Sequence, residues 1–179
     1  MVLLQERRPR LDPTSLFLTE KVVFTRRVAK VVAGGRHLRF NALVVTGDGQ
    51  GVVGAGLGKA NAIPDAVRKS AAIARKNLIR VPLRGSTIPH AVRTIYGSAE
   101  VLVKPAPAGT GIIASGTIRA VMEVAGIKDV VAKSLRSRNP VNVVRATLKA
   151  LQQIKEPSEE LAKRQEAPES RRVGEPWDS

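Results

Sequence analysis

The sequence predicts an α+β protein made of two units, β-β-β-α followed by β-β-α-β-α, and three observations support this. Runs rich in β-branched residues, separated by glycine turns, fill the early part of the chain and are typical of hairpins. Apolar residues recur later at helical spacing. Residues 81–86 (VPLRGS) interrupt both patterns and divide the chain. The 179 residues fit one or two small domains, and because only 3% are aromatic, the cores must consist of Val, Ile, Leu and Ala.

The first unit, residues 20–84, opens with two strands joined by a tight turn. Residues 22–33 form a strand by their β-branched content, Gly34-Gly35 is a two-residue hairpin signal, and residues 36–46 return as the second strand. Adjacent Arg26 and Arg27 interrupt the alternation, so they either point to opposite faces or lie at a bulge. One face of the second strand carries Leu38, Phe40, Ala42 and Val44, and the other carries His37, Arg39 and Asn41.

The stretch GDGQGVVGAGLGKAN, residues 47–61, follows the second strand and is rich in glycine. Its Asp-Gly turn leads into a third strand, residues 52–57, with Val53, Ala55 and Leu57 toward the core. Gly54, Gly56 and Gly58 leave the opposite face almost bare. Interior strand glycines mark the close approach of another backbone or a ligand, so RNA, a side chain or the protein's own helix must fill that space.

A basic helix completes the first unit. Pro64 suits its first turn and Asp65 its positive end. The apolar stripe is expected at Val67, Ala71, Ala74 and Leu78, in a run that extends to Arg80. Basic residues lie off this stripe.

The second unit, residues 85–155, has the order β-β-α-β-α. The expected elements are a strand at 87–96 interrupted by Pro89, a strand at 99–104, a rigid loop at 105–111, a helix closed by Gly126, a strand at 128–135 and a helix opened by Asn139-Pro140. Residues 1–19 are predicted to be an irregular extension, and residues 156–179 a polar, disordered tail.

The positive charge belongs to the folded part of the chain. The formal net charge is +15, and residues 20–155 hold 23 Lys/Arg against 6 Asp/Glu, whereas the tail from Glu156 holds 4 against 7. A core this basic repels itself unless a polyanion neutralises it. Nucleic acid is therefore the leading partner and an anionic membrane surface the second.

Several classes of protein are disfavoured by what the sequence lacks. With no cysteine and only two histidines, no Cys-based metal site or His cluster is expected. No segment reads as a signal peptide or a transmembrane span, so a cytoplasmic location is expected. No catalytic set converges, so we expect neither an enzyme nor a cofactor.

Two glycine runs partly match nucleotide-binding motifs. Gly58-Lys59 ends like a phosphate loop, but Val53 stands at the first glycine and Ala60 at the Mg²⁺-binding hydroxyl. Residues 109–114 (GTGIIA) approximate the dinucleotide pattern, yet Ala114 replaces its last glycine, and Asp129 opens the next strand instead of ending it. A hairpin turn and a tight strand-to-helix connection explain both runs better, although the amides of the second could still receive a phosphate or a partner's carboxylate.

Cations of the first unit form the strongest functional signal, because only Glu20, Asp48 and Asp65 oppose them. The candidates for phosphate contact are Arg26, Arg27, Lys30, Arg36, Arg39, Lys59, Arg68, Lys69, Arg75 and Lys76, with Gly34 and Gly35 at the hairpin turn. Aromatic residues that could stack on unpaired bases are nearly absent. This favours recognition of helical RNA by shape and backbone.

Two long segments resemble a known family. The run RRVAKVVAGGRHLRFNALVVTGDGQGVVGAGLGKANAIPDAVRKSAAIARKNL is similar to the N-terminal half of bacterial small-subunit ribosomal protein five, and PAPAGTGIIASGTIRAVMEVAGIKDVVAKSLRSRNPVNVVRATLKAL to its C-terminal half. The resemblance implies a double-stranded-RNA-binding-like first domain and a second domain of the ribosomal-protein-five domain-two type. Because no clear helix precedes the first strand, the usual first-helix contacts to a minor groove are in doubt.

The resemblance also implies a function and partners. A structural component of the small ribosomal subunit would bind small-subunit rRNA, stabilise head relative to body and touch ribosomal proteins four and eight. Gly34-Gly35 matches the family's rRNA-contacting loop, and Gly111 and Arg119 match the region that meets protein four and influences translational accuracy. The family also lines the channel through which messenger RNA enters.

Three alternatives stay open on the sequence alone. The first is a free RNA-binding regulator or chaperone, the second a nucleotide-using enzyme dependent on Lys59, and the third a basic peripheral membrane protein. The last is disfavoured because no helix combines a basic face with bulky Trp or Phe.

Overall fold

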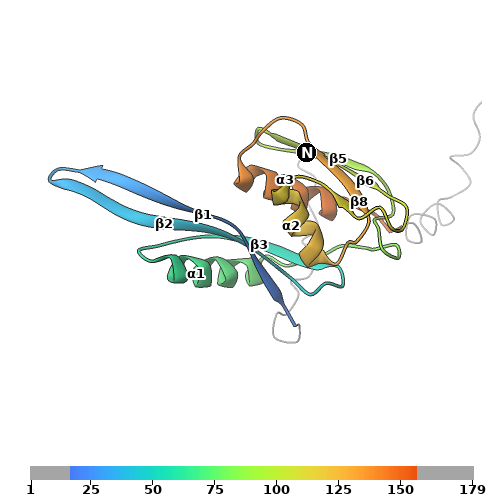
Figure 1. The fold of residues 1–179 in the computed structure, drawn as a ribbon, viewed down its shortest axis with the longest axis horizontal. Coiled ribbons are helices and arrows are strands. Elements are labelled where there is room, and N and C mark those ends of the chain that lie inside the picture. Colours follow the sequence, from blue (N-terminus) through green and yellow to red (C-terminus); the bar gives the residue numbers. More distant parts are fainter. Residues whose placement is uncertain (1–16, 157–179) are drawn as a thin grey trace, which may run out of the picture.

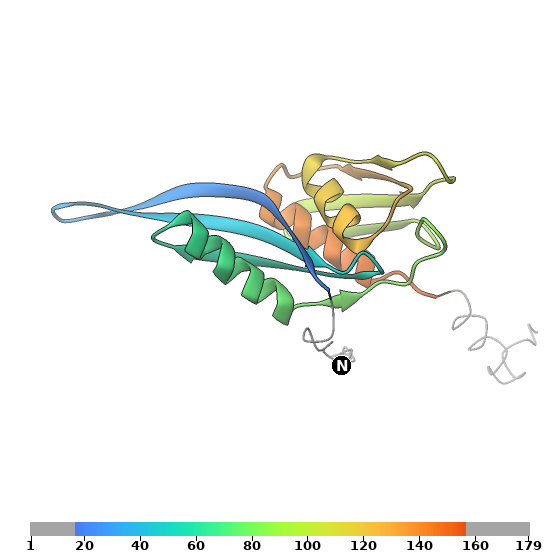
Figure 2. The ribbon, with the colours of Figure 1, turned by 60° about the horizontal axis from the view of Figure 1, so that its bottom comes forward.

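The computed structural model describes residues 17–156, which form four layers: a helix, a sheet, two helices and a second sheet (Figures 1 and 2). The elements are β1 (Thr19–Val32), β2 (Gly35–Gly47), β3 (Val52–Ala60), α1 (Ile63–Lys76), β4 (Ile79–Arg80), β5 (Val92–Tyr96), β6 (Ala99–Pro105), β7 (Ile112–Ile113), α2 (Gly116–Ala125), β8 (Val130–Ser134) and α3 (Pro140–Gln152). The sheets have the orders β1-β2-β3-β4 and β5-β6-β8-β7. The predicted α+β class and the β-β-β-α order of the first unit are confirmed.

The β1–β2 hairpin extends far beyond the body of the protein (Figure 1). Its strands pair antiparallel from Thr19 opposite Gly47 to Val32 opposite Gly35, with a bulge between Val22 and Phe24. The bulge therefore precedes the two adjacent arginines, Arg26 and Arg27, which point to opposite faces of the ribbon. We call residues 25–39 the arm, because almost all of them are solvent-exposed and, beyond Arg27, the hairpin has no third strand beside it.

Helix α1 fills the bare glycine face of β3. A Cβ atom built on Gly56 would lie 2.1 Å from the carbonyl oxygen of Ser70, and one on Gly54 would lie 2.5 Å from that of Ala74. Helix and strand thus approach backbone to backbone, which only glycine permits on the strand. The Ser70 hydroxyl also donates to the carbonyl of Ala42, on the neighbouring strand β2, at 2.7 Å. Of the possible occupants of this face, the protein's own helix is the one observed.

The predicted stripe of α1 was partly wrong. The helix ends at Lys76, so Leu78 is buried beyond it, and Val67 is only half-buried. The face that packs on the sheet consists of small residues, namely Ala66, Ser70, Ala71 and Ala74. Bulky side chains do not fit here because the glycines bring the helix too close to the strand.

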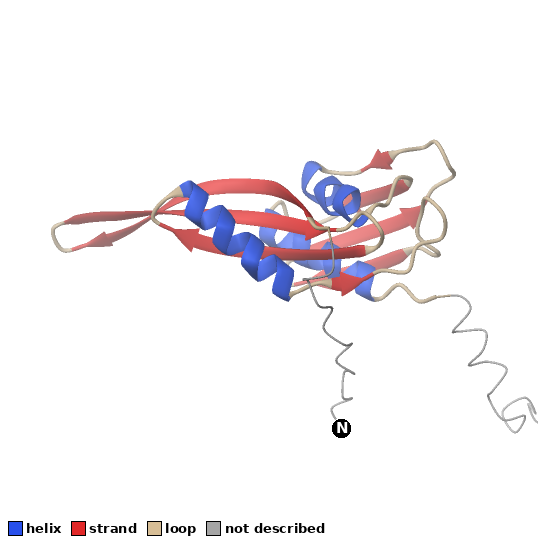
Figure 3. Cartoon of the chain, turned by 90° about the horizontal axis from the view of Figure 1, so that it is seen from below, coloured by secondary structure: helices blue, strands red, loops and turns tan. Residues whose placement is uncertain are grey.

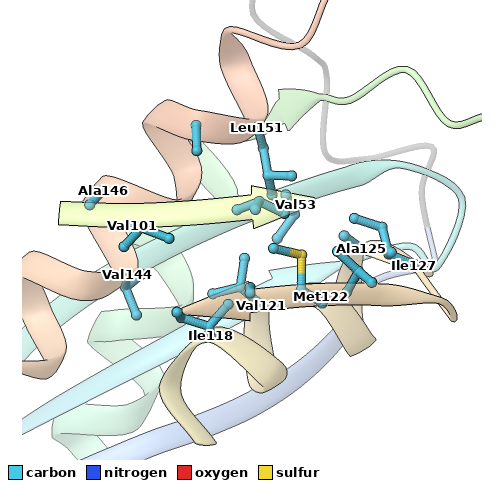
Figure 4. Packing of buried hydrophobic residues seen from close by; sticks show 14 of the residues in the cluster. Val53, Val101, Ile118, Val121, Met122, Ala125, Ile127, Val144, Ala146 and Leu151 are labelled. Carbon is cyan, nitrogen blue, oxygen red and sulfur yellow. The ribbon is translucent and has the colours of Figure 1, made fainter. Parts of the chain in front are cut away.

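The other face of the first sheet belongs to the main core. Leu43, Val45 and Val53 join a cluster of buried residues with Val101 of β6 and Val144 of α3; Figure 4 shows part of it. Helices α2 and α3 therefore lie between the two sheets. The inner end of β2 is buried on both faces, by α1 on one side and by this cluster on the other.

Both units contain more strand than expected. Short β7 precedes α2 and pairs in parallel with β8, while short β4 extends the first sheet, and neither was predicted. The strand expected at 87–96 begins only at Val92, since Pro89 cannot donate to a ladder, whereas Ile88 before it is fully buried. The division at residues 84 and 85 stays a prediction, because the main core draws on both sides of it. Residues 1–16 of the predicted extension and 157–179 of the predicted tail lie outside the described residues, and Thr19 already belongs to β1.

Candidate nucleic-acid interface

Cations line one face of the arm and of the strand beside it. Register places Arg26 opposite Asn41 and Asn41 opposite Lys59, so these three side chains form a row across β1, β2 and β3. Neighbouring strands lie about 4.8 Å apart, so the row spans roughly 10 Å. Lys30 and Arg39 share this face farther out.

The opposite face of the arm is also basic. Arg27 lies opposite Phe40 and Arg36 opposite Val31, and the four side chains alternate with those of the first face. An exposed ribbon with cations on both faces can contact phosphates on either side of it. Gly34 and Gly35 form the turn with φ of +95° and +151°, a conformation that residues with a Cβ rarely adopt.

The arm cations have no acidic partner in the described part of the chain. Ion pairs within residues 17–156 use Lys21, Arg75, Arg93 and Arg136. Arg26 instead lies over the ring of Phe24, 5.4 Å from its centroid, which orients the guanidinium while leaving its donors available. The buried Oδ1 of Asn41 has no hydrogen-bond partner in the described structure.

Helix α1 presents the remaining candidates at two places. Arg68, Lys69 and Lys76 are solvent-exposed. Arg75 donates to a carboxylate oxygen of Glu20 on β1 at 2.8 Å and is thereby partly engaged within the protein. The helix set and the arm set belong to different elements of the same unit, so one long polyanion could contact both.

The first glycine run serves as a joint between the two units. The amide of Gly49 donates to the Val124 carbonyl at 3.0 Å and that of Gly51 to the Ala125 carbonyl at 2.9 Å. Both acceptors lie in the last turn of α2, whose carbonyls otherwise lack helical partners. Asp48 shapes the turn by accepting from the amides of Gln50 and Val52. Residues 53–60, where the phosphate-loop pattern fell, lie in β3 and pair with β2, which contradicts a phosphate loop.

The second glycine run is likewise engaged internally. The carboxylate of Asp129 accepts the amide of Gly111 at 2.9 Å. A hydrogen bond from the Ser86 side chain, followed by those from the amides of the 109–111 loop, holds the pKa of Asp129 below its ordinary value of 3.8, against the opposing effect of burial. The amides that could have received a phosphate or a partner's carboxylate instead bind a carboxylate of this chain.

Gly111 and Arg119 lie on either side of β7 and the start of α2. Gly111 is half-buried with φ of +73°, and Arg119 is exposed on α2. The structure thus places both candidates for a protein contact in one short segment.

Other classes of site find no support in the described residues. A cavity of about 570 Å³ between β3 and α3 is lined mainly by aliphatic side chains, with Arg145 and Lys149 as its charged members. Residues 17–156 contain no cluster of three possible metal ligands and no helix long and apolar enough to cross a membrane.

Family comparison agrees with this geometry. Residues 18–82 match the profile described as ribosomal protein S5, N-terminal domain, and residues 94–165 match that of ribosomal protein S5, C-terminal domain. The chain belongs to the ribosomal protein S5 family. It is accordingly a non-enzymatic structural protein of the small ribosomal subunit that binds rRNA and other ribosomal proteins. The basic composition had indicated a nucleic-acid partner. The resemblance of the two long segments had indicated this family.

Asn41 is the functional candidate that the sequence reasoning missed. It was placed on the polar face of β2 with His37 and Arg39, but its position between Arg26 and Lys59 depends on the register of three strands. A period-two pattern assigns faces and does not assign neighbours across a sheet.

Proposed function

We propose that the arm, together with Lys59 and the basic residues of α1, binds the phosphates of small-subunit rRNA. The proposed contacts are Arg26, Arg27, Lys30, Gly34, Gly35, Arg36, Arg39, Lys59, Arg68, Lys69, Arg75 and Lys76. The observation that carries the proposal is the arm itself, an exposed ribbon with cations on both faces, no acidic partner among residues 17–156 and, beyond Arg27, no third strand beside it. A protein stabilised only from within would not keep such a charged element extended into solvent.

The proposal also gives the bound protein a mechanical role. One end of the molecule holds rRNA while the second unit contacts neighbouring proteins, so the chain connects head and body of the small subunit. Gly111 and Arg119 would meet ribosomal protein four, and this contact would influence decoding accuracy. Protein eight and messenger RNA near its entrance channel are further proposed partners.

A triple substitution on one arm face tests the rRNA contact. We expect Arg26→Gln, Lys30→Gln and Arg39→Gln together to weaken binding to purified small-subunit rRNA. The slope of log affinity against log salt should fall by about 2 to 3, since each lost phosphate contact removes close to one counterion. Lys104→Gln, Lys128→Gln and Lys133→Gln, on the second unit, form the charge-matched control. If both variants lost the same rRNA affinity, the arm would contribute through the net charge of the protein alone and not through its position.

The accuracy proposal needs its own readout. Arg119→Glu should change misreading in a dual-reporter assay while the variant still sediments with small subunits. Lys128→Glu, an exposed cation beyond the end of α2, is the matched control. Unchanged misreading by Arg119→Glu would remove this residue from the proposed interface.

A further inference from the structure

The second sheet has one uncovered face. Helices α2 and α3 pack on its inner face, where Val101, Val103 and Val130 are buried. The third helix of the described residues, α1, packs on the first sheet (Figure 3), so no helix among them covers the opposite side. Register places Arg93 and Lys133 on that outer face, on either side of Leu102. This outer face, which no helix within residues 17–156 covers, presents the apolar side chains of Ile95 and Val131 to solvent.

A buried carboxylate lies at one end of this face. The side chain of Glu100 on β6 is 3% exposed, yet it contacts two cations. Its Oε1 accepts a hydrogen bond from Nε of Arg93 at 2.5 Å, and its Oε2 lies 2.6 Å from Nε of Arg136 in a salt bridge. Arg93 also contacts Oε1 through Nη2. One carboxylate cancels one positive charge, so the trio keeps a net charge of +1.

Neutralising the charge of the buried Glu100 carboxylate requires only one arginine, so the second arginine is in excess. One bidentate guanidinium neutralises a buried carboxylate, whereas two on the same group are held close together and repel each other. The side chains of Arg93 and Arg136 are 65% and 64% exposed, so most of their donors face solvent. An anion that bridges these donors relieves the repulsion, and because the pair is already oriented, little side-chain freedom is lost on binding.

Two aliphatic side chains, those of Ile95 and Leu135, lie beside the two arginines. Ile95 lies directly opposite Glu100 in the β5–β6 ladder, and the amide of Leu135 donates to the backbone carbonyl of Glu100 at 2.8 Å. These two side chains are 47% and 45% exposed. Arginine beside exposed aliphatic residues is typical of protein interfaces, while a phosphate backbone offers little apolar surface to bury against them.

We propose that Arg93, Ile95, Glu100, Leu135 and Arg136, here called the Glu100 platform, dock a protein segment that presents a carboxylate beside aliphatic side chains. The carboxylate bridges the outer donors of the two arginines, and the aliphatic groups cover Ile95 and Leu135. Glu100 acts as a positioning residue. This surface is separate from the arm, so it does not rest on the proposed rRNA contacts.

Photo-crosslinking identifies the class of partner. Small subunits are assembled with full-length chain carrying a photoreactive phenylalanine analogue at position 95, irradiated and digested. We expect an adduct with a peptide of another protein that contains Asp or Glu. An adduct with rRNA nucleotides, or no adduct beyond that of a position-65 control, would overturn the proposal.

Charge at the platform is tested with the crosslinked peptide made synthetically. Arg93→Gln with Arg136→Gln should weaken its binding to the full-length chain at least tenfold, and replacing the peptide's carboxylate by an amide should cause no further loss in that variant. Lys104→Gln with Lys133→Gln is the matched control on the same face. Because the arginine variant leaves Glu100 buried without partners, Ile95→Asp provides a second test with the trio intact, and it too should weaken binding at least tenfold. Unchanged affinity in both variants rejects the platform, and rRNA affinity should stay unchanged throughout.

Discussion

The amide of Gly49 donates to the carbonyl of Val124 at 3.0 Å, so a turn of the first sheet caps the last turn of α2. Gly126, the residue that ends α2, lies against the same turn: a Cβ built on it would be 1.9 Å from the Gly49 carbonyl oxygen. Three glycines, Gly49, Gly51 and Gly126, therefore make a backbone joint between the two units. Local sequence patterns do not indicate this contact, because its partners are far apart along the chain.

Gly126→Ala should weaken that joint. The residue has φ of +81°, which costs an alanine about 1–2 kcal/mol before any steric overlap with Gly49 is added. We expect a lower midpoint of urea unfolding and faster amide exchange at Gly49 and Gly51. Gly109→Ala, which also has positive φ but meets no atom within 4 Å, is the control for backbone strain alone. If the two variants lose equal stability, overlap at the joint contributes nothing.

Gly56→Ala tests the approach of α1 to β3. A strand alanine normally gains stability over glycine by up to about 1 kcal/mol. Here the new methyl group would meet the Ser70 carbonyl at 2.1 Å, so overpacking should dominate and lower the free energy of unfolding by about 3 kcal/mol. The matched control is Gly116→Ala, at the start of α2 with open space around it, and this change should be neutral or slightly stabilising. Urea denaturation of both variants measures the difference, and an unchanged midpoint for Gly56→Ala would mean a looser contact than described.

Asp129 should make stability depend on acid pH. Hydrogen bonds, first from Ser86 and then from the amides of the 109–111 loop, lower the pKa of this carboxyl group in the folded protein below 3.8. Such a group stabilises the fold above its unfolded-state pKa, and the stabilisation is lost as pH falls through the folded-state pKa. Asp129→Asn should therefore be less stable than the parent chain at pH 6, and the difference should shrink below about pH 4.

Urea unfolding at several pH values between about 6 and 2.5 measures this trend. Asp65→Asn, an exposed carboxylate in the first turn of α1, is the control. A difference between Asp129→Asn and the parent that stays constant with pH would show that the Asp129 contacts do not depend on its charge.

Local patterns predicted the long elements well. The β-branched runs, the Gly34-Gly35 turn and the Asn139-Pro140 helix start all depend on neighbours in sequence, and Asn139 indeed accepts the amide of Val141. Two-residue strands such as β4 and β7 carry too few side chains to show a period. They exist because the tertiary fold brings them beside a longer strand.

The candidate site was predictable in composition and less so in arrangement. Excess charge identified the arm cations, but the pairing of Arg75 with Glu20 and the row through Asn41 required the register and the helix position. The same limit applies to Glu100, since an acidic residue within a strand gives no sign that two arginines from other segments will converge on it.

The arm has one consequence for genetics. An isolated two-stranded hairpin is only marginally stable in water, and residues 25–39 contribute almost nothing to the buried core. Substitutions there should leave the folding and the cellular level of the protein unchanged. They should instead disturb assembly, so that fewer small subunits, or structurally altered ones, are formed. Substitutions at Gly56 or Gly126 should instead destabilise the fold and thereby lower the amount of the protein. Defects in assembly and defects in abundance would then map to different ends of one molecule.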